Sequence, residues 1–140
     1  MFSLEQKLVI REGEGERRQF DGRVVEWLQT PQRTGGRYSS VCVCVYEPGK
    51  RAKPAHSHPN GEETIYIVSG SGKVKIGQEI SDIGPGSVCL FPQGVPHMVW
   101  NTGGEPLKLC CFYAPDASAV EYAWHEEFDF PEFLEGGRNG

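Results

Sequence analysis

The sequence has no apolar run long enough to cross a membrane and no concentrated basic segment. Its amino terminus lacks the basic stretch and following apolar stretch of a secretory signal peptide. The formal net charge of −5 argues against a general attraction to nucleic acid or to anionic membranes, because phosphate binding needs a clustered basic face. We therefore expect a soluble, cytoplasmic protein that binds neither nucleic acid nor membrane.

Disulfide bonds are not expected either. The chain has five cysteines, an odd number, and no export signal. Cys42 and Cys44 share a face of a predicted strand, and Cys110 and Cys111 are adjacent. One C-x-C pair is weak evidence for a thiolate metal site or a redox pair. We expect these side chains to be small buried apolar residues of a core.

Short strands joined by tight turns should dominate the fold. Eighteen glycines and ten prolines in 140 residues favour many turns over long helices, and this length suits one domain. Residues 4–10 could form a short strand, and Asp21-Gly22 is a dipeptide typical of a hairpin turn between two strand pieces. The composition therefore predicts an all-β protein.

Residues 37–47 form the clearest predicted strand outside the site described below. Both of its faces are apolar: one carries Val41, Val43 and Val45, and the other carries Cys42, Cys44 and Tyr46. One face should line the interior and the other should be covered by a neighbouring sheet or subunit. The pattern is compatible with either orientation. Strands with two apolar faces also indicate a homodimer, because one barrel interior covers only one face of each strand.

A candidate metal site begins with two histidines separated by one residue. Side chains alternate along a strand, so His56 and His58 point to the same side and can bind one ion. Glu63 stands at the head of a strand-like run, and the loop of residues 59–62 can turn the chain back to bring its carboxylate to the same point. His97, which follows a turn rich in glycine and proline, is the fourth candidate ligand.

These residues resemble the two sequence motifs of the cupin family. Residues 49–70 resemble the first motif, in which His-x-His is followed by three or four residues, a Glu, six residues and a Gly. Residues 86–101 resemble the second motif: Gly, five residues, Pro-x-Gly, two residues, His, three residues and Asn. Every place of the second motif is filled. In the first motif, six residues instead of the usual five lie between Gly49 and His56.

The resemblance implies a double-stranded β-helix, a jelly-roll barrel, with a short helical or irregular tail at the carboxyl end. We expect residues 1–115 to form the barrel with edge strands near the amino terminus. Residues 116–140 should form a tail that packs on the barrel, with a short helix starting at Asp116 and disordered last residues. In its functional interpretation this tail is a lid that brings His125, Glu126 or Glu127 to the site.

Alternation predicts which side chains face the metal. Ile65 and Ile67 share the face of Glu63, whereas Tyr66 and Val68 point the other way. In the strand that His97 opens, Val99 and Asn101 should point inward, with Asn101 ordering the turn or supporting a ligand. Glu62 should be a surface carboxylate.

Three imidazoles and one carboxylate differ from the thiolate-rich tetrahedral sites of structural zinc. This donor set suits Fe, Mn, Ni, Co, Cu or Zn as a divalent ion, and in octahedral coordination it leaves two positions open for water, dioxygen or a substrate. The sequence therefore predicts a metal-dependent enzyme acting on a small oxygen-rich substrate, either a dioxygenase or an isomerase or lyase. The alternatives are a non-catalytic small-ligand-binding or sensor cupin and, less favoured, a storage protein.

A general base is not evident from the sequence. Candidates near the mouth of the site are Tyr46, Glu47, Tyr66, His125 and Glu126. Of these, Tyr66 and His125 are the predicted catalytic residues.

Overall fold

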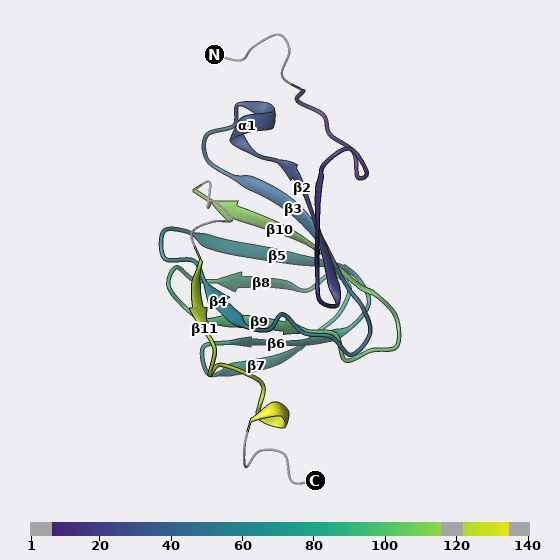
Figure 1. The fold of residues 1–140 in the computed structure, drawn as a ribbon, viewed down its shortest axis with the longest axis vertical. Helices are drawn as coiled ribbons and strands as arrows, with labels where there is room; N and C mark the ends of the chain where they lie inside the picture. The colour runs from purple at the N-terminus through teal and green to yellow at the C-terminus, as the bar shows by residue number, and fades with distance from the viewer. Residues whose placement is uncertain (1–6, 116–121, 135–140) are drawn as a thin grey trace.

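The computed structural model describes residues 7–115 and 122–134, and its strands form two antiparallel sheets (Figure 1). The larger sheet contains β1 (Glu16–Phe20), β2 (Arg23–Gln29), β3 (Ser40–Tyr46), β5 (Glu62–Ser69), β8 (Val88–Phe91) and β10 (Leu107–Ala114). The smaller sheet contains β4 (Ala55–Ser57), β6 (Gly72–Ile76), β7 (Glu79–Ile83), β9 (His97–Trp100) and β11 (Ala123–His125). The strand orders are β1-β2-β3-β10-β5-β8 and β11-β4-β9-β6-β7. This architecture confirms the predicted all-β jelly roll.

The main core lies between the two sheets, and β3 shows how the register selects its inner face. Cys42, Cys44 and Tyr46 are buried in this core, whereas Val41 and Val45 are half-buried. Cys44 lies opposite Val25 of β2 and Leu109 of β10, and all three belong to the same cluster. The cysteine face of this strand therefore lines the interior, which the sequence pattern left open.

The amino-terminal part adds two strands to the edge of the larger sheet. β1 and β2 pair through a two-residue turn at Asp21 and Gly22, as predicted, and Gly22 has a φ of 77° that favours glycine. Residues 7–10 are not in a strand, so the strand predicted over residues 4–10 is wrong in its described part. A short helix, α1 (Pro31–Thr34), interrupts the loop between β2 and β3.

The carboxyl-terminal segment joins the smaller sheet as a strand. β11 pairs with β4, with Trp124 opposite His56, so Trp124 is not in a helix as predicted. This pairing satisfies backbone N–H and C=O groups at the edge of β4, which would stay unpaired if residues 123–125 formed a separate helix. The rest of the predicted helix and the last residues of the chain lie outside the described residues. No helix of the described part has the length and apolarity needed to span a membrane.

Beyond β11 the chain contacts the outer face of the smaller sheet, ending in the 3-10 helix η1 (Pro131–Phe133). Phe130 is fully buried against Ala55 and Met98. Asp129 accepts two hydrogen bonds from the Arg51 guanidinium, each 2.8 Å, and its backbone carbonyl accepts one from Lys75 Nζ at 2.7 Å. A buried apolar anchor and a two-pronged ion pair thus hold this segment against the sheet.

We expect Asp129→Ala to lower the free energy of unfolding by about 2–3 kcal/mol, because it leaves the Arg51 guanidinium without its buried partner. The loss should lie below the usual range for a fully buried pair, since the Arg51 side chain remains 22% exposed. Urea unfolding monitored by circular dichroism would measure the change. Glu132→Ala, which removes an exposed carboxylate three residues away, serves as the control and should change stability little. Equal stability of the two variants would contradict this role of Asp129.

Candidate metal centre

Three strands of the two sheets bring four buried polar side chains together. His56 lies in β4 directly opposite His97 at the start of β9, while His58 follows β4 and Glu63 lies in β5. Each offers one ligand atom, and these atoms all lie within 4.8 Å of one another. The alternation that places His56 and His58 on one side, and the turn that returns the chain to Glu63, act as the sequence predicted.

Hydrogen bonds orient the donor atoms of this cluster. Glu63 Oε1 lies 3.0 Å from His58 Nε2 and 3.4 Å from His97 Nε2. His97 Nδ1 lies 3.2 Å from the carbonyl oxygen of Val95, which can only accept a hydrogen bond. His97 therefore carries its proton on Nδ1 and directs the lone pair of Nε2 toward the centre of the cluster.

Three buried nitrogen atoms of the cluster have no hydrogen-bond partner: His56 Nδ1, His58 Nδ1 and His97 Nε2. An unsatisfied buried polar atom typically costs about 1–3 kcal/mol, so three in one place need a physical explanation. Imidazole nitrogens beside a carboxylate are common ligands of divalent transition metals. The donor set and its orphaned nitrogens therefore fit a metal ion.

The electrostatics of the cluster favour the ligand forms of its side chains. Burial, reinforced by the neighbouring His97, lowers the pKa of His56 to about 2 and keeps its imidazole neutral. Burial acts to raise the pKa of Glu63, but the hydrogen bond from His58 and the proximity of His97 outweigh it and hold that pKa below its usual range. A neutral imidazole and an ionised carboxylate are the forms that coordinate a cation.

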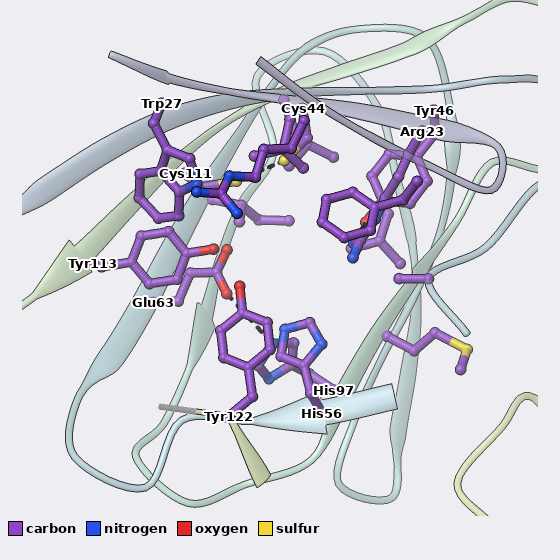
Figure 2. A pocket seen from close by; sticks show the side chains of 18 of the residues that line it. Arg23, Trp27, Cys44, Tyr46, His56, Glu63, His97, Cys111, Tyr113 and Tyr122 are labelled. Carbon is purple, nitrogen blue, oxygen red and sulfur yellow. Dashed lines mark hydrogen bonds and ion pairs between the residues drawn. The ribbon is translucent and has the colours of Figure 1, made fainter. Parts of the chain in front are cut away.

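A cavity of about 270 Å³ opens between the sheets beside the cluster (Figure 2). Aromatic rings of the cavity wall contact the histidines. The Tyr122 ring stacks on His56 with centroids 4.4 Å apart and planes 5° apart, and the Tyr113 ring meets His58 edge-on at 5.1 Å. Tyr113 also lies opposite Glu63 in the β10–β5 ladder. The candidate ligands thus form one wall of an aromatic cavity large enough for a small molecule.

The two predicted catalytic residues do not line this cavity. Tyr66 lies on the outer face of β5 and is 44% exposed, because its position in the strand has the opposite parity to Glu63. His125 Nε2 lies 2.8 Å from the hydroxyl oxygen of Ser57, the residue between His56 and His58. Because side chains alternate along a strand, His56 and His58 point inward and Ser57 points outward. His125, which contacts Ser57, therefore also lies outside the cavity.

Among the other candidate bases, Tyr46 lines the cavity, whereas Glu47 and Glu126 are exposed. Glu127, the remaining candidate of the lid interpretation, is exposed too. The carboxyl-terminal segment does reach the cavity, but through Tyr122 and Trp124.

Other predicted positions agree with the structure. Ile65 and Ile67 are fully buried, whereas Val68 is exposed. Asn101 donates hydrogen bonds to the carbonyl oxygens of Tyr46 and Glu105, and its Oδ1 accepts one from the backbone of Gly103, so it orders the turn after β9. Glu62 is exposed, as predicted.

The cysteines are buried in the interior, with one exception. Cys42, Cys44 and Cys111 belong to the main core, as expected, and their sulfur atoms lie within 4.8 Å of one another. Cys44 and Cys111 approach to 3.7 Å between sulfur atoms. Cys110, of opposite parity, is half-buried.

Several cavity residues were not predicted from the sequence, among them Arg23, Tyr113 and Tyr122. Tyr113 could have been found, because it shares the parity of Leu107, Leu109 and Cys111 in β10. Arg23 has the same parity as Val25 and Trp27, but an arginine at the start of a strand gives no sequence signal for an inward direction. Tyr122 depends on a long-range pairing that the local pattern does not contain.

Comparison with known proteins agrees with this geometry. Residues 42–113 match the family described as the cupin domain. The chain is a cupin. An uncharacterised protein of Methanocaldococcus jannaschii is 31% identical over 96 residues, which cover 68% of this chain and 76% of that protein.

Solved structures share the same fold. A protein with a double-stranded β-helix domain from Klebsiella pneumoniae superposes with a TM-score of 0.69 at 22% identity, covering 86% of this cupin and 99% of that chain. The oxalate decarboxylase of Lactobacillus farciminis superposes with a TM-score of 0.76 at 19% identity, covering 86% and 36% respectively. At these identities the similarity establishes the fold.

The pKa of His56 predicts how the stability of the metal-free cupin depends on pH. The unfolded chain binds a proton at this histidine near pH 6.5, whereas the folded protein does not accept it until about pH 2. The free energy of unfolding should therefore fall by about 1–2 kcal/mol between pH 7 and pH 5. Glu63 contributes in the same direction only below its unfolded pKa of about 4.3, outside this window. Urea titrations of wild type and His56→Gln at both pH values would test this, and an equal fall in both proteins would contradict it.

Proposed function

We propose that this cupin is a metal-dependent enzyme that binds a divalent transition metal through His56, His58, Glu63 and His97. Its substrate is a small oxygen-rich molecule held in the cavity beside the ion. The observation that carries the proposal is the set of three buried nitrogens without a hydrogen-bond partner, grouped around an ionised carboxylate in the cavity wall. A structural role alone would not explain why three buried polar atoms beside a cavity remain without a hydrogen-bond partner.

A bound ion would act as a Lewis acid on a substrate oxygen or, in the case of iron or copper, support chemistry with dioxygen. The side chains around it supply hydrogen-bond donors. Burial raises the pKa of Tyr122 and that of Tyr113, so both phenols keep their protons at neutral pH. Protonated phenols can stabilise negative charge that develops on a substrate oxygen. This favours isomerase or lyase chemistry over the dioxygenase alternative.

Metal content should depend on the candidate ligands. We expect His58→Ala and Glu63→Ala each to lower the metal affinity by more than about 100-fold. Loss of a residue that only hydrogen-bonds to a ligand typically lowers it by about 10–100-fold, and these two residues are candidate ligands themselves. Elemental analysis of protein purified without a histidine tag would measure the occupancy, and circular dichroism would check the fold. Glu62→Ala, which removes the exposed neighbouring carboxylate, is the matched control and should keep full occupancy. Full occupancy in all three variants would contradict the ligand assignment.

Oxygen uptake separates the two chemistries. Metal-loaded protein incubated with catechols and diketones should consume no oxygen if the isomerase or lyase assignment is correct. Rapid uptake that disappears in His58→Ala would instead establish the dioxygenase alternative. Binding of small acids or sugars without conversion under any condition would favour the ligand-binding or sensor function.

We also propose that the cupin forms a homodimer through the outer face of its larger sheet. Tyr66, Val88, Leu90 and Phe112 are all more than 40% exposed on β5, β8 and β10. They are neighbours in the ladders: Tyr66 lies opposite Val88, and both Leu90 and Phe112 lie opposite the same residue, Thr64. An exposed apolar patch of this kind is typical of a surface that a partner covers. In such a dimer Tyr66 would contribute to the interface instead of acting as a catalytic residue.

Replacing the centre of this patch should dissociate the dimer. We expect Val88→Lys combined with Leu90→Lys to give a monomer, because two buried charges in an apolar interface are costly. Light scattering coupled to gel filtration would measure the mass. Ile80→Lys alters an exposed apolar residue of the smaller sheet and should leave the dimer intact. A wild-type protein that is monomeric at high concentration would contradict the proposal.

A further inference from the structure

An arginine of the amino-terminal hairpin reaches into the cavity of the metal centre. Arg23 opens β2 and shares the inward parity of Val25 and Trp27, so its side chain enters the space between the sheets. Its Nη1 donates a hydrogen bond to the Tyr46 hydroxyl at 3.1 Å. The guanidinium also lies over the Phe20 ring, 4.8 Å from its centroid. Figure 2 shows Arg23 and Tyr46 across the open space from His56, His97 and Tyr122.

The positive charge of Arg23 is not neutralised by the described residues. Among residues 7–115 and 122–134, no carboxylate lies within ion-pair distance of its guanidinium. Glu63, the carboxylate of the same cavity, lies 3.0 Å from His58 Nε2 and 3.4 Å from His97 Nε2 instead. The hydrogen bond to Tyr46 occupies one of five N–H donors. The aromatic contacts offset only part of the cost of burying the guanidinium charge.

The field of this charge extends across the cavity. Burial raises the pKa of Tyr122, and the Arg23 charge opposes that rise. Burial likewise raises the pKa of Tyr46, which the Arg23 charge again opposes. Since Tyr122 stacks on His56, the guanidinium and the metal centre act on the same small volume. Any molecule of a size to fill about 270 Å³ beside the metal centre would meet both.

We propose that Arg23, positioned by Tyr46, is an anion-binding residue and that the substrate of this cupin is a small organic acid whose carboxylate pairs with the guanidinium. This inference rests on the proposed function, because a second oxygen of the acid would face the metal centre. The planar guanidinium fork matches a carboxylate in two parallel hydrogen bonds. Arg18 also lines the cavity, but its Nη2 pairs with Glu16 at 2.6 Å, so among the described residues Arg23 is the cavity arginine without an ion-pair partner. One unpaired guanidinium suits one carboxylate better than the higher charge of a phosphate. Arg23 also precedes residues 42–113, so the match to the family does not include it.

Calorimetric titration of the metal-loaded protein with malonate, and with malonamide as the uncharged counterpart, tests the inference. Arg23→Gln should weaken malonate binding about 10–100-fold, the loss expected for a charge-assisted hydrogen-bonded pair. Malonamide should bind weakly to wild type and variant alike. Arg37→Gln removes the same charge from an exposed residue outside the cavity and should bind malonate as the wild type does.

A second variant of Arg23 and a second anion extend the test. If Arg23→Gln fails to fold, Arg23→Lys retains the charge without the fork and should weaken malonate binding by a smaller factor, about 3–10-fold. Unchanged malonate affinity in every folded Arg23 variant would overturn the inference. Inorganic phosphate that binds more tightly than malonate, in an Arg23-dependent manner, would overturn the assignment to an organic acid.

Metal analysis and malonate titration together separate the anion site at Arg23 from the proposed metal-dependent enzyme. If wild-type protein takes up no metal but malonate still binds in an Arg23-dependent manner, the anion site stands and the metal-dependent enzyme does not. If metal binds through the predicted ligands and Arg23→Gln changes nothing, the enzyme proposal stands and the anion site does not.

Discussion

The placement of four polar side chains inside an otherwise apolar core is the constraint on which the rest of the site depends. His56, His58, Glu63 and His97 are buried, and the hydrogen bonds among them leave three imidazole nitrogens unsatisfied. Burial of polar atoms without partners opposes folding, so a site of this kind is maintained where a ligand compensates it. The low pKa of His56 and the ionised state of Glu63 have the same origin, because burial and close approach select the forms that bind a cation.

The cavity has two chemically different sides. The candidate metal centre lies on one side, between a stacked and an edge-on tyrosine ring, and the Arg23 guanidinium lies on the other. One side carries three buried imidazole nitrogens without a hydrogen-bond partner, and the other carries a guanidinium without an ion-pair partner among the described residues. The proposed substrate, a small acid with a second oxygen, would complement both sides.

The two ends of the chain complete a site whose ligands all come from its middle. Arg23 arrives with the amino-terminal hairpin, and Tyr122 arrives just before β11 pairs with β4. The buried Phe130 and the Asp129–Arg51 pair hold the following residues against the smaller sheet. These end segments lie outside the residues that match the cupin family, so they are where this chain can differ from other cupins in what it binds.

Local rules were sufficient for the ligands, the hairpin at Asp21-Gly22 and the inward direction of Ile65 and Ile67, because side-chain alternation and turn chemistry act within a few residues. The same alternation should have excluded Tyr66 from the cavity. The sequence by itself determined the fold class and the four candidate ligands that the structure brings together. Only the tertiary structure decided which apolar face of β3 is internal, that Trp124 lies in a strand, and that Arg23 and Tyr122 enter the cavity. Those outcomes depend on the register between strands distant in the chain, which no local pattern encodes.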